Sequence, residues 1–179
     1  MTQLVQLQQV AHELEANGYS LCAISNDPAE ILSEFAEKRG ITYSLLSDPE
    51  SQVIRSFGIM NQLIEESEGR SMNWHGIAYP GTYFLNPDGT VHDKDFHRHH
   101  ARRSSGATVL ARALGRDVEL SPDNSADATD GGLALRVGLS DPSLRLEMIS
   151  TLAVDIQIPT GLHAYAQRAP EQFTPLTLS

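Results

Sequence analysis

The sequence has few of the residues that build disulfide frameworks, metal clusters or membrane spans. Among its 179 residues there is a single cysteine, Cys22, and aromatic side chains make up only 6%. One cysteine excludes an internal disulfide and any C-x-x-C metal or redox motif within this sequence, so a disulfide could only join two molecules. No stretch approaches the roughly 18 apolar residues of a membrane-spanning helix.

Basic residues are also scarce. The chain carries 13 Lys and Arg against 23 Asp and Glu, a net charge of −10, whereas binders of duplex nucleic acid rely on basic groups. Residues 1–7 lack the basic and apolar regions of a secretory signal. We therefore expect no nucleic-acid partner. We expect the chain as written to be cytoplasmic, and a longer native form could instead be periplasmic. No phosphate-binding glycine loop is present, and we expect no cofactor.

Residues 1–58 alternate between helix and strand patterns. Leu4, Leu7 and Leu14 lie at helical spacing with Gly18 after them, which predicts an opening amphipathic helix. The apolar run over 19–25 predicts a parallel strand covered on both faces. The next predicted elements are a helix to Gly40 with Asp27, Pro28 and Glu30 as its capping box, a strand over 41–46, and a helix that starts at Asp48-Pro49-Glu50 and ends before Gly58.

A hairpin is predicted after a polar segment over 60–74, which is typical of a loop with a short helix. Residues 75–85 and 90–96 have strand patterns, and Asn86-Pro87-Asp88-Gly89 between them is a turn sequence. A last helix ends before Gly115. Together these elements predict an α/β domain over residues 1–115.

The composition changes after residue 115. Residues 116–131 are rich in Asp, Ser, Pro and Gly, which predicts a linker. Residues 133–139 and 151–158 alternate apolar and polar positions, which predicts strands. The remaining 132–179 segment is shorter than the about 100 residues of a β-sandwich, so we expect a partial all-β domain.

Four motifs of the first part point to a known family. They are QLVQL at 3–7, CAISNDP at 22–28, YSLLSDP at 43–49 and YPGTYFLNPDG at 79–89. Together with the order of elements, they resemble the peroxiredoxin-like redoxins, the alkyl hydroperoxide reductase and thiol-specific antioxidant family of the thioredoxin fold. The resemblance covers residues 1–115 and implies thiol-dependent reduction of hydroperoxides, with a thioredoxin-like protein as the reductant.

The resemblance also implies that a catalytic element is absent. In that family the reactive cysteine lies at the N-terminal end of the helix that begins here near Thr2, where the helix dipole lowers the thiol pKa. Its place, and that of the strand leading into the helix, falls before Met1. We therefore expect an incomplete thioredoxin-like fold without its central first strand, no catalytic residue in this chain, and an open sheet edge through which copies of the chain could associate.

The tail carries a second resemblance. Residues 158–166 (IPTGLHAYA) and Phe173-Thr174-Pro175-Leu176 are similar to the immunoglobulin-like N-terminal domain of bacterial thiol:disulfide interchange proteins. In those proteins the domain presents a surface to other redox proteins. The resemblance implies a partial immunoglobulin-like segment after the linker, because the sequence ends before such a domain would be complete.

Two candidate sites have an alternative interpretation. Cys22 could be a reactive thiol, but its apolar run favours a buried, structural one. Tyr79, Pro80, Gly81 and Thr82 are expected to lie beside the active site. Pro80 stands where the family has a cis-proline or, in many peroxiredoxins, an arginine that holds the thiolate; otherwise it only begins a strand of the hairpin.

The basic cluster after the hairpin is a further candidate. His97, His99 and His100 could bind a transition metal, but they contain no i, i+4 pair, so we expect a solvated loop and no metal site. Trp74 and His75 are expected on the active-site side of the domain. The other members of the cluster, or residues near it, are His92, Asp95, Arg98, Arg102 and Arg103.

Two functional hypotheses stay open. In the first, the chain belongs to a thiol-dependent peroxidase or thiol–disulfide oxidoreductase whose longer form carries the cysteine. In the second, it is a non-catalytic interaction module of the redox family that pairs through its strand edges or its β tail. The acidic group Glu65, Glu66 and Glu68 favours neither, because no apolar residues surround it to raise a carboxyl pKa.

Overall fold

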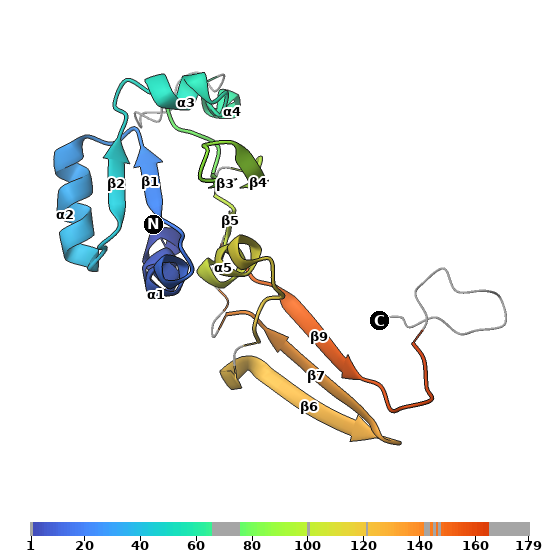
Figure 1. Cartoon of the computed structure of the whole chain (residues 1–179). Helices are drawn as coiled ribbons and strands as arrows, with labels where there is room; N and C mark the ends of the chain where they lie inside the picture. The colour runs from blue at the N-terminus through green and yellow to red at the C-terminus, as the bar shows by residue number, and fades with distance from the viewer. Residues whose placement is uncertain are drawn as a thin grey trace.

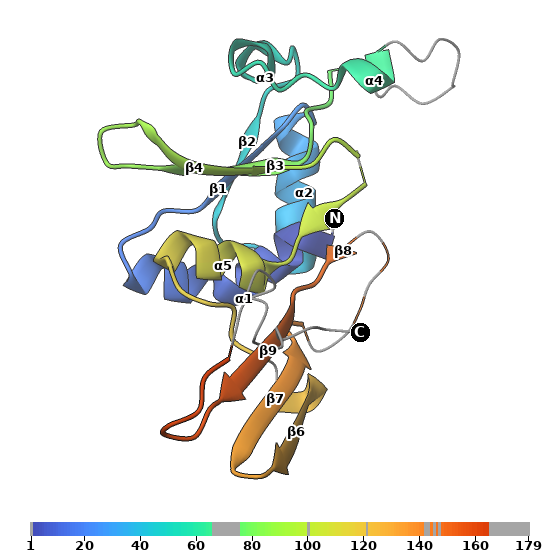
Figure 2. The same ribbon diagram turned by 90° about the vertical axis from the view of Figure 1, so that its right-hand side faces the viewer.

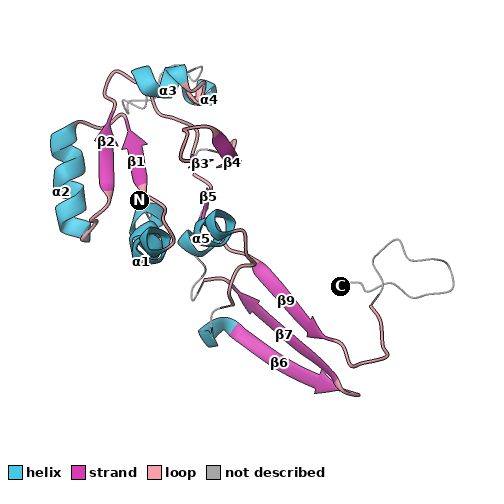
Figure 3. Cartoon of the chain, in the orientation of Figure 1, coloured by secondary structure: helices cyan, strands magenta, loops and turns pink. Residues whose placement is uncertain are grey.

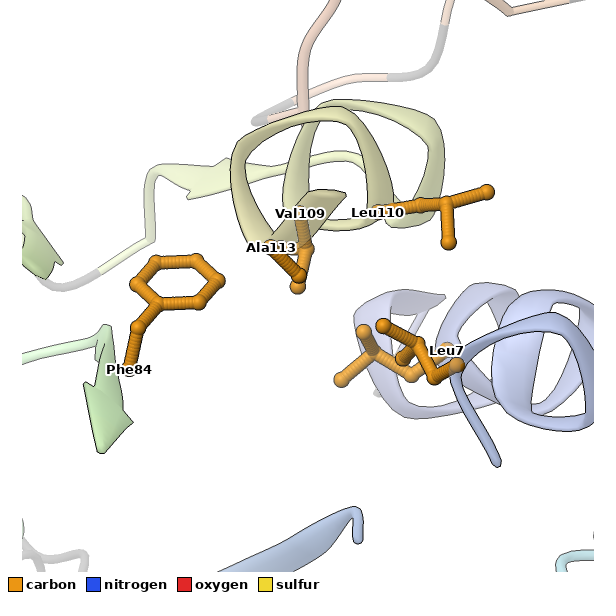
Figure 4. Packing of buried hydrophobic residues seen from close by; sticks show 6 residues of the cluster. Leu7, Phe84, Val109, Leu110 and Ala113 are labelled. Atoms are coloured by element: carbon orange, nitrogen blue, oxygen red, sulfur yellow. The ribbon is translucent and has the colours of Figure 1, made fainter. Parts of the chain in front are cut away.

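Helix α1 (Thr2–Ala16) opens the chain, as predicted, and its leucines build the main core. The computed structural model of the chain describes residues 2–65, 76–99, 101–120, 122–141, 144, 146 and 148–164. Helix α5 (Gly106–Leu114) packs against α1 because both helices present one apolar face. The buried cluster is Leu7 and Leu14 from α1, Phe84 from a neighbouring strand, and Val109, Leu110 and Ala113 from α5 (Figure 4).

Strands β1 (Cys22–Ser25) and β2 (Ser44–Ser47) form a parallel pair, and helix α2 (Ala29–Arg39) packs on β2. Both strands are shorter than predicted, because Tyr19, Leu21 and Tyr43 pack on the α1–α5 core outside the ladder. The prediction that the first strand is covered on both faces is wrong, since Ile24 in β1 is 38% exposed.

The predicted capping box of α2 is also wrong. Pro28 is the N-cap residue and makes no side-chain cap bond. The Asp27 carboxylate instead accepts a hydrogen bond from the Ser25 hydroxyl, a local pairing that competes with capping. A carboxylate does cap the start of α3 (Gln52–Ser56), where Asp48 accepts hydrogen bonds of 2.9 Å from the N–H groups of Gln52 and Ile54.

The hairpin is confirmed. Strands β3 (Gly81–Leu85) and β4 (Val91–Phe96) are antiparallel, and the predicted turn closes them through a bond from Asn86 N–H to the Thr90 carbonyl. Part of the preceding polar segment forms the short helix α4 (Gln62–Glu65). The first strand begins at residue 81 rather than 75, and Trp74 and His75 lie outside the described residues.

The two strand pairs of this part do not join into one sheet. Within the described residues β1 pairs only with β2, and β3 only with β4. Figure 1 shows the ribbons of the two pairs apart from each other, with α1 below β1 and α5 below the β3–β4 hairpin. Each pair therefore leaves both of its outer strand edges without a described strand partner.

A separate three-stranded sheet follows α5. Strands β6 (Ser125–Asp130), β7 (Leu133–Leu139) and β9 (Leu152–Gln157) are antiparallel in the order β6-β7-β9 (Figure 3). They follow the 3₁₀ helix η1 (Pro122–Asn124). The linker predicted over 116–131 is therefore wrong at β6, whose Ala126 and Ala128 pair with apolar residues of β7 despite the polar composition.

The strands predicted at 133–139 and 151–158 are confirmed as β7 and β9. The two short strands β5 (Arg103–Ser104) and β8 (Met148–Ile149) pair in parallel and join this region to the first part. The immunoglobulin-like character of the tail and the division into domains stay predictions, and residues 165–179 lie outside the described part. None of the described helices is long and apolar enough to cross a membrane.

Replacing Asp48 with alanine should lower the free energy of unfolding by about 1–3 kcal/mol, because two backbone N–H groups at the start of α3 lose their acceptor. Asp48 is 6% exposed, so water replaces the carboxylate poorly. Urea denaturation measures the change. The exposed Glu50→Ala in the same loop is the control, and an equal loss in both variants would contradict the capping role.

Tyr43 should make stability fall in alkaline solution. Its hydroxyl donates a 2.9 Å hydrogen bond to the Leu4 carbonyl, and burial raises the Tyr43 pKa to about 12. Because the folded-state pKa lies above the unfolded value near 10, this contribution is complete below pH 10 and is lost as the pH rises toward 12. Unfolding measured from pH 8 to 12 should show a steeper alkaline loss in the parent than in Tyr43→Phe; equal slopes would refute this assignment.

Candidate functional site at the N-terminal end of α1

The first turns of α1 are held by the junction between β5 and α5. The Gln3 side-chain amide donates a 3.0 Å hydrogen bond to the Ser104 carbonyl, and the Gly106 N–H lies 3.4 Å from the Gln6 side-chain oxygen. A Cβ on Gly106 would stand 2.6 Å from the Gln6 carbonyl oxygen, so glycine permits this close approach. Figure 2 shows the N-terminus beside β5.

Ser104 connects this helix end to strand β4. Ser104 is only 4% exposed, and its hydroxyl donates a hydrogen bond to Asp95 Oδ2. His97 Nε2 lies 3.1 Å from the same hydroxyl oxygen, and Arg112 Nη1 lies 3.0 Å from Asp95 Oδ1. We call Asp95, His97, Ser104 and Arg112 the Ser104 network. Because the hydroxyl gives its one hydrogen to Asp95, His97 Nε2 is the donor to Ser104.

The Arg112 guanidinium binds two carboxylates, those of Asp93 and Asp95. Arg112 Nη2 lies 2.7 Å from Asp93 Oδ2, so one guanidinium joins Asp93 and Asp95 of β4 to α5. The guanidinium carbon also lies 5.7 Å from the centroid of the Phe84 ring. The backbone hydrogen bond from Lys94, and then the Arg112 side chain, lower the pKa of Asp93. The network thus carries fixed charge next to the main core.

The residues predicted at the start of the first hairpin strand lie against this network. The Pro80 carbonyl accepts a 3.0 Å bond from the His97 N–H, and Thr82 pairs with Asp95. Directly opposed residues of an antiparallel pair share a face, so Thr82 and Asp95 do. Gly81 pairs with Phe96, whose ring occupies the space of a Gly81 side chain.

The cis-proline implied by the resemblance is not found, because the described peptide bonds include no cis bond and the one before Pro80 is trans. Trans is the preferred isomer of most proline bonds in folded proteins. Tyr79 N–H donates to the Ile59 carbonyl at 2.8 Å, and Pro80 directly precedes β3. The alternative, that Pro80 begins a hairpin strand, agrees with this position.

The histidine cluster is only partly brought together. His97 joins the Ser104 network, whereas the His99 ring accepts a local bond from Ala101 N–H at 3.3 Å. His100, Glu66 and Glu68 lie outside the described residues. Within the part of the chain that the structure describes, no three His, Cys, Asp or Glu side chains are arranged to hold a metal ion.

Cys22 is exposed, which corrects the prediction of a buried thiol. It is the first residue of β1 and pairs with Ser44. The apolar run around it predicts burial only if strands flank β1 on both edges, and β1 has a described neighbour on one edge alone. The exposure of Cys22 thus follows from the divided sheet.

Iodoacetamide or a disulfide reagent should label Cys22 in the folded chain without denaturant, with a stoichiometry of one. Mass spectrometry of the tryptic peptide locates the label, and Cys22→Ser is the blank. Labelling that requires denaturant would show that the thiol is buried after all.

Sequence reasoning missed Gln3, Ser104 and Arg112. The acidic residues Asp93 and Asp95 alternate along one strand face, which was a visible sign that β4 meets a cation. Nothing local identified that cation, or the contact of Gln3 with a residue 101 positions away. A pocket of about 250 Å³ lies elsewhere, against Val10, Glu13 and Arg116.

Comparisons with known proteins agree on the family of the first part. The sequence model of the AhpC/TSA family matches residues 1–94. Peroxiredoxin Bcp of Escherichia coli K12 is 38% identical over 83 residues, 44% of this chain and 47% of that protein. Alkyl hydroperoxide reductase C of Staphylococcus aureus is 22% identical over 144 residues, 77% of this chain and 70% of that protein.

One solved structure is similar in fold. The crystal structure of Enterococcus faecalis AhpC gives a TM-score of 0.52 at 20% identity, over 64% of each chain. The bcp protein of Haemophilus influenzae is 32% identical over 91 residues, 55% of its length. The chain thus spans about half the length of the Bcp relatives that it matches.

Proposed function

Because this chain belongs to the AhpC/TSA family, we propose that it is the scaffold of a thiol-dependent peroxidase whose reactive cysteine acts at the N-terminal end of α1. In that reaction a thiolate attacks one peroxide oxygen, the S–O bond forms as the O–O bond breaks, and the leaving oxygen takes up a proton as alcohol or water. A second thiol then condenses with the sulfenic acid, releasing water and forming a disulfide. A thioredoxin-like protein is the proposed reductant of this disulfide.

The position of the α1 N-terminal end carries the proposal. Gln3 binds Ser104 there, and the Ser104 network extends to the strand start at Pro80 and Thr82. The first turn of α1 contains no acidic residue. The free N–H groups and the helix dipole at such an end favour a thiolate over a thiol.

Cys22 does not suit this role. It pairs in the β1–β2 ladder and does not stand at the start of a helix, so it lacks the dipole that stabilises a thiolate. We therefore assign it no catalytic step. Because it is the single cysteine of the sequence, the chain as written is proposed to be inactive.

We further propose that the reactive cysteine and a strand leading into α1 belong to a part of the native protein outside this sequence. A strand between β1 and β3 would pair with the edge that each leaves without a described partner. Buried backbone groups without partners cost about 1–3 kcal/mol each, so such a strand would stabilise the fold. The share of the Bcp relatives that the chain covers supports a longer protein.

Protein isolated from its native source should consume hydroperoxide with a thiol reductant and form a sulfenic acid that dimedone traps. The matched control is a Cys22→Ser substitution made at the native gene, which should leave turnover within about twofold because Cys22 takes no part. Loss of turnover in Cys22→Ser would contradict the assigned cysteine. Absence of any peroxide-reactive thiol in the native protein would contradict the proposed reaction.

A non-catalytic interaction module is the second candidate. Ile24 in β1 and Leu85 in β3 are 38% and 50% exposed, and both strands keep an edge without a described partner. Strand edges of this kind pair readily with other chains. This candidate predicts a stable oligomer without peroxide turnover, so sedimentation and the turnover assay together separate it from the first.

A further inference from the structure

Two separate ionic links, one from α5 and one from the residue after its C-cap, lie near the two ends of α1. Near the N-terminal end, Arg112 binds Asp93 and Asp95. Asp95 accepts a hydrogen bond from the Ser104 hydroxyl, and the Ser104 carbonyl accepts one from the Gln3 side chain. Near the C-terminal end, Arg116 binds Glu13 of α1. Arg112 lies in the last turn of α5, and Arg116 follows its C-cap Gly115. Of the two arginines, Arg112 is the one connected through Asp95 and Ser104 to the first turn of α1.

We propose that the Ser104 network sets how reactive a thiol at the N-terminal end of α1 is toward electrophiles, with Arg112 raising the reactivity and Asp95 lowering it. This inference rests on the proposed function, which assigns the reactive thiol to this end of α1. Gln3, in the first turn, donates to the carbonyl of the same Ser104 whose hydroxyl donates to Asp95.

Among the described residues, hydrogen bonds and ion pairs connect Ser104 to the titratable and charged side chains of Asp93 and Asp95 in β4, His97 after β4, and Arg112 in α5. Arg103 directly precedes Ser104 in β5. The side chains of Asp95 and Arg112 are 15% and 35% exposed, so water screens them less than a surface pair. Removing a unit charge from a partly buried group near a thiol shifts the thiol pKa by about half a unit, which is about threefold in thiolate at neutral pH.

The experiment installs one thiol at this site in the full chain. Thr2→Cys combined with Cys22→Ser gives a single cysteine beside Gln3, and its alkylation by iodoacetamide is followed from pH 6 to 10. Arg112→Gln and Asp95→Asn are then added separately. Arg116→Gln is the matched control, because it removes the same charge just beyond the C-cap of α5, where Arg116 binds Glu13 near the other end of α1.

Arg112→Gln should slow alkylation at pH 7 by about threefold, and Asp95→Asn should accelerate it by about threefold, because they change the nearby charge in opposite directions. Arg116→Gln should leave the rate within about 1.5-fold, since its charge lies farther from the thiol. The opposite signs cannot come from general loosening of the fold, which would move both rates in the same direction.

Three results would overturn the inference: equal rates in all variants, a change of the same sign in Arg112→Gln and Asp95→Asn, or an effect of Arg116→Gln as large as that of Arg112→Gln. If circular dichroism shows that Arg112→Gln does not fold, Asp95→Asn decides alone, and an unchanged rate refutes the network. Failure of the proposed function would appear instead as a native protein without a peroxide-reactive thiol, a result that this assay does not depend on.

Discussion

The packing of α1 on α5 is the interaction on which the first part of the structure depends. Leu7 and Leu14 meet Val109 and Leu110 there, and the close approach at Gly106 leaves no room for a side chain. Dense packing of this kind holds two rigid helices in one relative position. It fixes where α1 begins relative to the hairpin, and the polar contacts of Gln3 with Ser104 refine that position.

The same packing explains how a divided sheet is held. Phe84 brings the β3–β4 hairpin to the core, while Tyr19, Leu21 and Tyr43 attach the β1–β2 pair to it. Each strand pair is therefore fixed to the helices, although within the described residues no ladder joins the two pairs. The exposure of Cys22 and Ile24 is a direct consequence, because the side chains of a strand with a neighbour on one edge alone have fewer residues around them.

Local patterns were enough to predict the elements that depend on local physics. The leucine spacing of α1, the turn Asn86-Pro87-Asp88-Gly89 and the alternation of β7 were all confirmed. The Ser104 network could not be predicted, because Gln3 and Ser104 meet only through helix packing across 101 positions. β6 was missed because its polar sequence forms a strand through its partner β7 and not through its own propensity.

We propose that this chain is a thiol peroxidase scaffold and that the reactive cysteine, with its strand, belongs to a part of the native protein outside this sequence. Intact mass with N-terminal sequencing of the protein from its native source tests this most directly. We expect a mass well above the 19.6 kDa of this sequence, with residues before Met1 that include a strand and a cysteine. A native mass that equals the sequence as written, with Met1 as its first residue, would contradict it.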